Sequence, residues 1–309
     1  MIGAGVGKNL GARRIVNTYL VSGATGLIGS AVVRALAARG DRVIAAARNA
    51  AKASDMFAGL SGVEVVRWDV TAPAEIAGNV DYIVHAASET ASKAFVEDPD
   101  GVRRVIVEGT RNALTLAAEK HVKGMVFLST FEVLLDIDPQ SPRASYPQAK
   151  LEAERLCRES GIPVRIARLV QTFGPGVVRG DKRVFSQFAE AIADGRDIVL
   201  HTEGRTARCY CYIDDAVEAI LLLLEKGVAG EAYIVANPDT YCTIREMAEM
   251  LCRAHPKSKV VVDLGAAAGK GYAPEFQMRL TAEPLEALGW KAKTGLAEAF
   301  RRLLESWRG

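Results

Sequence analysis

The chain has 309 residues, which is enough for one large domain or two moderate ones with a substantial core. Hydrophobic residues make up 49% of it and charged residues 25%, the composition of an ordinary soluble globular protein. The 39 Lys and Arg are nearly balanced by 37 Asp and Glu, which argues against a nucleic-acid-binding protein, and no segment reaches the ~20 apolar residues of a membrane helix.

Residues 1–14 contain no sustained apolar core, so we interpret them as an N-terminal extension rather than a signal peptide. Within this extension, "GAGVGK" (3–8) is similar to a phosphate-binding loop. No strand precedes it, however, and Ile2 and Asn9 stand where that motif requires glycine and Ser or Thr. We therefore assign no phosphate site there.

Residues 15–172 alternate short runs of β-branched residues with helical patterns. The predicted strands are 17–23, 41–48, 63–69, 81–87, 124–130 and 163–170, and the predicted helices include 28–39, 101–120 and 147–160. Strands that alternate with helices are joined by right-handed crossovers into a parallel sheet with helices on both faces. The pattern predicts an α/β fold with a doubly wound parallel sheet.

The stretch "LVSGATGLIGS" places Gly23, Gly26 and Gly29 between the first strand and the first helix. Two of these glycines let the backbone turn tightly and approach a pyrophosphate, and the third lets helix and strand pack closely, with the helix N-terminus facing the phosphates. Because strand, turn and helix occur in this order, we predict a dinucleotide site. Its predicted contacts in this turn are Gly23, Thr25, Gly26, Leu27, Ile28 and Gly29.

The second predicted strand ends in Ala47 and Arg48, where an NAD site normally offers a carboxylate to the ribose. An arginine at this place suits the additional phosphate of NADP. The pattern favours NADP slightly and leaves NAD open.

After about residue 172 the alternation changes to a mixed, loop-rich pattern, typical of a region that selects substrate. We predict a smaller C-terminal substrate domain over 173–309, from which about 206–236 returns to the first domain. Asp214 and Asp215 begin a helix in this region, and Thr243 and Glu246 have the spacing of a capping box.

Tyr146 and Lys150 are four residues apart, which places them on one face of a helix. A tyrosine has a pKa of ~10, and a neighbouring ammonium together with a positive nicotinamide ring favours its phenolate. Thr130, next to Ser129 at the end of the fifth strand, is the hydroxyl expected to hold a substrate oxygen opposite the phenol. The pattern predicts a hydride-transfer site.

With these motifs the sequence resembles the extended short-chain dehydrogenase/reductases, and specifically the nucleotide-sugar epimerase/dehydratase family. The resemblance covers nearly the whole chain from about Thr18. It rests on "GATGLIG" (23–29), "WDV" (68–70), "HAAS" (85–88), "EGTRNAL" (108–114), "STFEV" (129–133), "YPQAK" (146–150), "RLVQTFGPG" (168–176), "RCYCYIDDAVEAI" (208–220) and "LEALGW" (285–290). It implies a Rossmann domain, a small sugar-nucleotide domain, and a homodimer that packs helices 101–120 and 147–160 of each subunit into a bundle.

The resemblance also implies roles for individual residues. Thr130, Tyr146 and Lys150 would be catalytic, and Tyr146 and Lys150 would also contact the cofactor. The remaining implied cofactor contacts, besides the glycine turn and Arg48, are Asp69, Val70, His85, Ala86 and Ala87. The implied substrate contacts are Ser88, Thr130, Gln171 and Arg208, the last of which would meet the diphosphate.

Glu132 is the residue whose role the sequence leaves open. Dehydratases of the family carry a tripeptide similar to Thr-Asp-Glu, with an aspartate acid and a glutamate base, whereas this chain has Thr130-Phe131-Glu132. Glu132 is therefore a candidate acid or base for dehydration, another elimination or epimerisation. Its alternatives are capping a loop or binding a sugar hydroxyl. Other departures from the family pattern, at Ile106, Leu134, Leu135 and Gln171, leave the identity of the sugar open.

The leading hypothesis is an NAD(P)-dependent epimerase or dehydratase that oxidises a nucleotide-linked sugar at C4. The alternatives are an NADPH-dependent ketone reductase and a non-catalytic, dinucleotide-sensing regulator. The five scattered cysteines indicate a protein of the cytoplasm with reduced thiols, and no histidine spacing indicates a metal site. A nucleotide-diphosphate sugar and a second copy of the chain are the expected partners.

Overall fold

The computed structural model describes residues 15–265 and 275–308. The N-terminal extension and its glycine-rich "GAGVGK" lie outside the described residues. Within the described ranges, no helix has the length and apolar character needed to cross a membrane.

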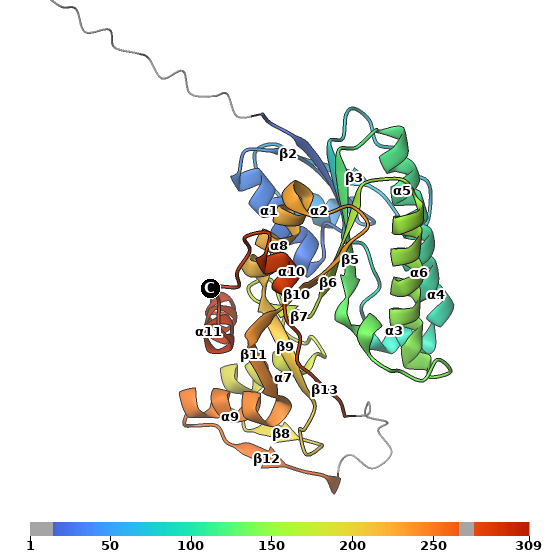
Figure 1. Ribbon diagram of the computed structural model, residues 1–309. Coiled ribbons are helices and arrows are strands. Elements are labelled where there is room, and N and C mark those ends of the chain that lie inside the picture. Colours follow the sequence, from blue (N-terminus) through green and yellow to red (C-terminus); the bar gives the residue numbers. More distant parts are fainter. Residues whose placement is uncertain (1–14, 266–274, 309) are drawn as a thin grey trace, which may run out of the picture.

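A seven-stranded sheet forms the centre of the larger region, and all of its strand pairs are parallel (Figure 1). The strand order is β10-β6-β5-β4-β1-β2-β3. Their bounds are β1 (Thr18–Ser22), β2 (Arg42–Ala47), β3 (Val63–Arg67), β4 (Tyr82–His85), β5 (Gly124–Thr130), β6 (Val164–Leu169) and β10 (Ala232–Val235). The order reverses between β1 and β4, so the crevice beyond their carboxyl ends is the expected ligand site of a doubly wound sheet.

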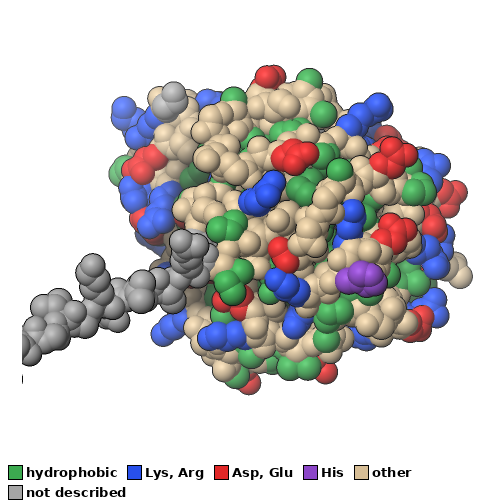
Figure 2. Space-filling model, turned by 90° about the horizontal axis from the view of Figure 1, so that it is seen from above, with side chains coloured by type: hydrophobic (Ala, Val, Ile, Leu, Met, Phe, Trp, Pro, Cys, Tyr) green, Lys and Arg blue, Asp and Glu red, His purple; other side chains and the backbone are tan. Residues whose placement is uncertain are grey.

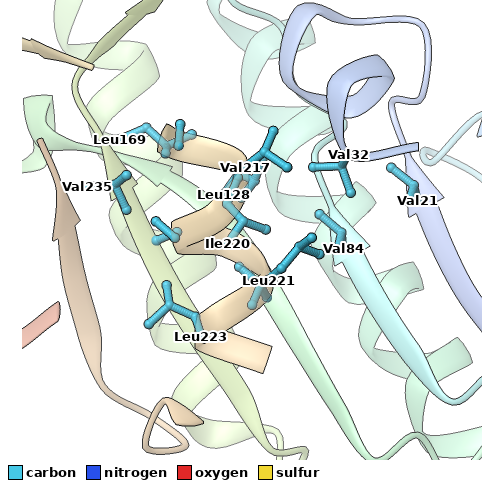
Figure 3. Packing of buried hydrophobic residues seen from close by; sticks show 14 of the residues in the cluster. Val21, Val32, Val84, Leu128, Leu169, Val217, Ile220, Leu221, Leu223 and Val235 are labelled. Carbon is cyan, nitrogen blue, oxygen red and sulfur yellow. The ribbon is translucent and has the colours of Figure 1, made fainter. Parts of the chain in front are cut away.

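Helices cover both faces of this sheet, as predicted. One layer contains α1 (Leu27–Ala38), α2 (Ala50–Met56) and α8 (Ile213–Lys226), and the opposite layer contains α3 (Ser92–Glu97), α4 (Pro99–Arg103), α5 (Gly109–Glu119) and α6 (Ser145–Glu159) (Figure 1). Figure 3 shows how α8 packs on the sheet: Val217, Ile220, Leu221 and Leu223 meet strand residues Val84, Leu128, Leu169 and Val235. Burial on both faces explains why β5 is buried along its whole length.

The helix predicted over 101–120 is helical throughout but divides into three parts. A π-helical turn, η1 (Arg104–Glu108), separates α4 from α5. At this point the helix approaches the loop after β3, where Asn112 Nδ2 donates to the Val70 carbonyl at 2.7 Å and a Cβ on Gly109 would lie 2.8 Å from Val70 Cγ2. The close approach fixes the position of Val70 after β3.

The smaller region is built around β9 (Ala207–Tyr212), which pairs with β7 (Gln171–Phe173), β11 (Asn237–Thr243) and β13 (Gln277–Met278). A second small sheet joins β8 (Ile198–Leu200) to β12 (Val260–Val262), and the helices of this region are α7 (Val184–Ala193), α9 (Ile244–Ala254) and α11 (Leu296–Ser306). The short helix α10 (Glu283–Glu286) lies beside β10 instead, and its Leu285 is buried in the core of the main sheet (Figure 1). The predicted capping box of Thr243 and Glu246 begins α9, and β10 returns from this part of the chain to pair with β6 in the main sheet. On the face drawn in Figure 2, Lys and Arg side chains are interspersed with Asp and Glu.

Candidate active site

A cavity of about 300 Å³ lies at the carboxyl ends of β1, β4, β5 and β6, where the strand order reverses. It brings together many of the residues that the sequence predicted. These are Gly23, Gly26, Leu27, Ile28, Gly29, Ala86, Ser88, Thr130, Glu132, Tyr146, Lys150 and Gln171. Segments from the glycine turn to residue 171 thus meet at one edge of the sheet.

The glycine turn has the geometry of a dinucleotide cradle. Gly23 has a φ of +65°, and a Cβ there would lie 2.7 Å from the Ala87 backbone. Helix α1 begins directly after Gly26, which makes no side-chain capping hydrogen bond, so backbone N–H groups are available for an anion. These features fit a bound dinucleotide pyrophosphate. Ala86 lines the cavity, whereas Ala87 lies outside the lining with its backbone against Gly23.

Arg48 and Asp69 lie outside the cavity lining, at the ends of neighbouring strands. Arg48 is exposed directly after β2, and Asp69 follows β3. Hydrogen bonds from the Thr71 backbone and hydroxyl hold the pKa of the Asp69 carboxyl below its usual range, with a smaller contribution from Arg48. The two charged groups are therefore close enough to interact, at the place where an adenosine ribose is expected.

His85 is buried at the end of β4, where its ring contacts other residues of the sheet. Its Nδ1 lies 2.7 Å from Ser22 Oγ, and its ring stacks on Phe127 with ring centroids 6.0 Å apart. Burial, followed by the charge of Lys150, lowers the pKa of His85 to about 3. The imidazole is neutral near pH 7, and its contact with Ser22 joins the ends of β1 and β4.

Tyr146 lies near the start of α6, and its hydroxyl makes hydrogen bonds with Thr130 and Ser88. Its ring stacks on Phe95 with centroids 4.6 Å apart and an angle of 7° between the planes. Phe95 lines the cavity and was not found from the sequence, because no local pattern connects it to the tyrosine. The stack and the two hydroxyl contacts hold the phenol toward Thr130.

The expected lowering of the Tyr146 pKa is not produced by the residues of the chain. Burial raises the pKa of the phenol, and the Glu132 carboxylate raises it further, against smaller opposite effects of the Thr130 and Ser88 hydrogen bonds. The positive ring of an oxidised nicotinamide, if one were bound in this cavity, would favour the phenolate.

Lys150 is 2% exposed, and its ammonium donates to the Leu128 carbonyl at 2.7 Å. The same nitrogen lies 4.9 Å from the centre of the Phe127 ring and 5.8 Å from that of Tyr146. Burial lowers the pKa of Lys150 to about 7. Its charge is thus sensitive to its surroundings near neutral pH, unlike that of an exposed lysine.

Glu132 is half-buried in the short 3-10 helix η2 (Phe131–Leu134) that follows β5. Its N–H donates to Thr130 Oγ1 at 3.2 Å, so Thr130 caps this helix as well as contacting the phenol. Burial raises the pKa of the Glu132 carboxyl, and the Arg208 and Arg143 charges oppose the rise. The raised pKa and the position near the Tyr146 phenol make Glu132 a candidate for proton transfer.

Of two arginines from the smaller region, one lines the cavity and the other does not. Arg208 is on β9 and lies outside the cavity lining. Its guanidinium is 4.8 Å from the centre of the Phe276 ring. Its Nε is buried and has no hydrogen-bond partner among the described residues. Arg183, in contrast, lines the cavity and donates from Nε to Asp181 Oδ1 and from Nη2 to Asp181 Oδ2, a bidentate ion pair. The only signal for Arg183 in the sequence is the basic loop "VVRGDKR".

Comparison with known proteins decides the family. A model described as "NAD dependent epimerase/dehydratase family" matches residues 19–236. The chain belongs to this family. The resemblance to extended short-chain dehydrogenase/reductases and the Rossmann-type fold class are thereby confirmed.

Two curated proteins of Arabidopsis thaliana are similar to this chain over most of its length. UDP-glucuronic acid decarboxylase 6 is 30% identical over 94% of this chain and 88% of its own length. UDP-glucuronic acid decarboxylase 1 is 28% identical over 97% of this chain and 71% of its own length.

Two solved structures share the fold over most of the chain. The dTDP-glucose 4,6-dehydratase of Streptomyces venezuelae, solved with NAD bound, has a TM-score of 0.77 and 25% identity and covers 94% of this chain and 97% of its own. A UDP-glucose 4-epimerase of Thermotoga maritima has a TM-score of 0.79 over 94% of this chain and 98% of its own, and at 22% identity it shows the fold alone. By their names these relatives are enzymes, which supports an enzyme here.

Proposed function

We propose that the protein transiently oxidises a nucleotide-linked sugar at C4 and then epimerises or dehydrates it. The single observation that supports this most strongly is the convergence of Thr130, Tyr146, Lys150 and Glu132 beside the glycine turn in one cavity. A bound NAD or NADP would accept hydride from the sugar and return it. The glycine turn would hold its pyrophosphate.

The chain's own residues would carry the proton transfers. Tyr146 Oη takes the O4 proton while Thr130 and Ser88, its hydrogen-bond partners, hold the reacting oxygen. Lys150, behind the phenol, supplies a positive charge and fixes the ring. Oxidation at C4 acidifies the C5 hydrogen, and we propose that Glu132, which lines the same cavity, removes it.

A second candidate reaction is decarboxylation, favoured by Phe131. This residue stands where the dehydratases of the family carry their acid, and it is 2% exposed, so no acid is available there for a C6 leaving group. A C4 ketone on a uronic acid is a β-keto acid, which loses CO2 by breaking the C5–C6 bond without such an acid. The names of the curated relatives agree with this chemistry.

For the cofactor we propose NADP, bound through Arg48, with NAD as the alternative. Arg48 is exposed at the end of β2, and Ala47 offers no carboxylate to a ribose hydroxyl. Solved relatives contain NAD, so the two dinucleotides need direct comparison.

We also propose that the chain divides into a Rossmann domain over 15–172 and a substrate domain over 173–309.

We further propose that two copies of the chain form a homodimer through the outer faces of α4, α5 and α6. Leu151 on α6 is 44% exposed, which supports an apolar contact there. Sedimentation equilibrium measures the assembly; a monomer at micromolar concentration would contradict the dimer.

The test of function is incubation with UDP-, dTDP-, GDP- and CDP-sugars, UDP-glucuronic acid included, in heavy water with NAD or NADP. Inversion at C4 without solvent deuterium indicates an epimerase. A 4-keto-6-deoxy product with deuterium at C5 indicates a dehydratase, and a pentose product with release of CO2 indicates a decarboxylase. Absence of turnover with every sugar nucleotide would overturn the proposal.

A further inference from the structure

Behind the cavity, a carboxylate is buried one helical turn after Lys150. Glu154 has a fully buried side chain in α6 and accepts hydrogen bonds from Ser129 Oγ at 2.6 Å and from Arg168 Nε and Nη2 at 2.9 and 2.6 Å. Arg158, one turn further along α6, lies 3.1 Å from the same carboxylate. Burial by itself would raise the pKa of Glu154, but these hydrogen bonds and charges hold it below its usual range. Glu154 is therefore a buried anion.

The proposed function does not use this cluster, and stability does not explain it. A buried ion pair loses the hydration of both charges, and replacing such a pair with apolar residues often leaves stability unchanged or increased. The positions that the cluster joins point to another role.

The cluster fixes the strand ends that carry the reacting groups. Ser129 is adjacent to Thr130, and in the register of the sheet it is paired with Arg168 of β6. Glu154 therefore ties the ends of β5 and β6 to α6. The hydrogen bond from Lys150 to Leu128 ties the same helix to the preceding residue of β5. Together these contacts set the distance between α6, with Tyr146, and the strand end, with Thr130.

The cluster also sets the charge around Lys150. Burial lowers the pKa of Lys150, while Cys157 and Glu154 are the groups that raise it. Burial raises the pKa of the Cys157 thiol to about 12, so this thiol is neutral near pH 7 and has no charge to contribute. From β4, His85 faces Lys150 and is neutral as well. Arg168 faces the opposite side of Glu154 and partly cancels its charge.

We propose that Glu154 is a positioning residue of the active site, which clamps the ends of β5 and β6 to α6 and supplies the negative charge that favours the ammonium form of Lys150. The relevance of this role to catalysis rests on the proposed function of Tyr146 and Lys150. The electrostatic part is independent of it, since it concerns the state of Lys150 in the protein itself.

Two variants that each remove one charge of the cluster distinguish this role of Glu154 from general damage to the fold. Removing the Glu154 charge leaves Arg168 uncompensated, and the Lys150 pKa falls. Removing the Arg168 charge leaves Glu154 with Ser129 and Arg158 as the partners that hold it an anion, so its charge is less compensated and the Lys150 pKa rises. A loosened structure would expose Lys150 to water in both variants and move both values in the same direction.

The experiment is a pH titration of protein labelled with ¹³C-lysine, followed by the ¹H–¹³C signals of the lysine Cε groups. The Lys150 signal is assigned by its absence from Lys150→Met, and in the unaltered protein we expect its midpoint at about 7. Glu154→Gln is expected to lower the midpoint by ~1 pH unit or more, and Arg168→Gln to raise it. If Glu154→Gln does not fold, the rise in Arg168→Gln is the deciding result, and its absence overturns the inference.

Glu152→Gln is the matched control. Glu152 is on the same helix and has a bidentate ion pair of similar geometry, with Arg103 Nε and Nη2 at 3.0 and 2.6 Å, but this pair is exposed. The control should leave the Lys150 midpoint unchanged. A Glu154→Gln midpoint equal to that of the control, or shifts of the two cluster variants in one direction, would refute the role of Glu154.

Where a turnover assay is available, Glu154→Gln should lower the plateau of the pH–rate profile and move its alkaline limb to lower pH, because activity that needs the Lys150 ammonium is lost as pH rises through the lowered Lys150 pKa. Simple misplacement of Tyr146 would lower the plateau alone. The titration needs no substrate. Absence of turnover would therefore contradict the proposed function alone, and an unchanged Lys150 midpoint would contradict the role of Glu154 alone.

Discussion

Replacing Gly29 with alanine tests whether close packing of α1 against the glycine turn holds the cofactor site. An added Cβ would lie 2.9 Å from the Gly23 carbonyl carbon and nearer still to its oxygen. Ordinary carbon contacts are ~3.5 Å, so the turn has to withdraw by at least ~0.6 Å. Overpacking of this kind costs about 1–3 kcal/mol, against which alanine gains about 1 kcal/mol in helix propensity. We expect a net loss of stability of up to ~2 kcal/mol.

The displacement should affect the cofactor more than the fold, because Gly23 is the residue that the new methyl group pushes. We expect dinucleotide affinity to fall at least tenfold, about 1.4 kcal/mol, measured by calorimetric titration with NAD and NADP and set beside urea unfolding. Gly59→Ala is the control: its φ of +79° makes alanine strained, but no atom lies within 4 Å of the added Cβ. It should lose stability and keep affinity. Unchanged dinucleotide binding by Gly29→Ala would refute the packing argument.

Three further predictions concern single side chains. Tyr146→Phe should reduce turnover ~10²- to 10⁴-fold in a steady-state assay while dinucleotide affinity stays within ~2-fold, and retained turnover would show that another group takes the proton. Arg48→Ala should weaken NADP binding by ~10-fold or more and leave NAD binding unchanged; equal effects on both dinucleotides would remove Arg48 from the phosphate site. His85 has a pKa of about 3 when folded and an ordinary value of 6.5, so between these values only the unfolded chain binds its proton. Stability should fall as pH is lowered through this window, by up to ~1.4 kcal/mol per unit, and urea unfolding of His85→Gln at pH 4 to 7 should show a smaller dependence. An equal slope in that variant would assign the effect to other groups.

Short-range patterns were sufficient for the architecture and for much of the proposed site. Strand, glycine turn and helix follow one another in sequence, so Gly23, Gly26 and Gly29 could be placed before any tertiary contact was known. Tyr146 and Lys150 share a helix face by their spacing alone, and the Thr243 capping box depends on residues three apart. Each of these features is local, and local geometry restricts the backbone strongly.

Charge states and long-range partners required the folded chain. The sequence pointed to an ionised Tyr146 beside a charged Lys150, but burial raises one pKa and lowers the other, and burial depends on every element packed around α6. The stack of Phe95 on Tyr146 and the contact of Glu154 with Ser129 join residues far apart in the chain, without a periodic pattern that marks them. A charged group keeps or loses its hydration according to the residues that surround it in three dimensions. Motifs in the sequence therefore located the proposed reacting groups, whereas packing in the folded chain sets their protonation.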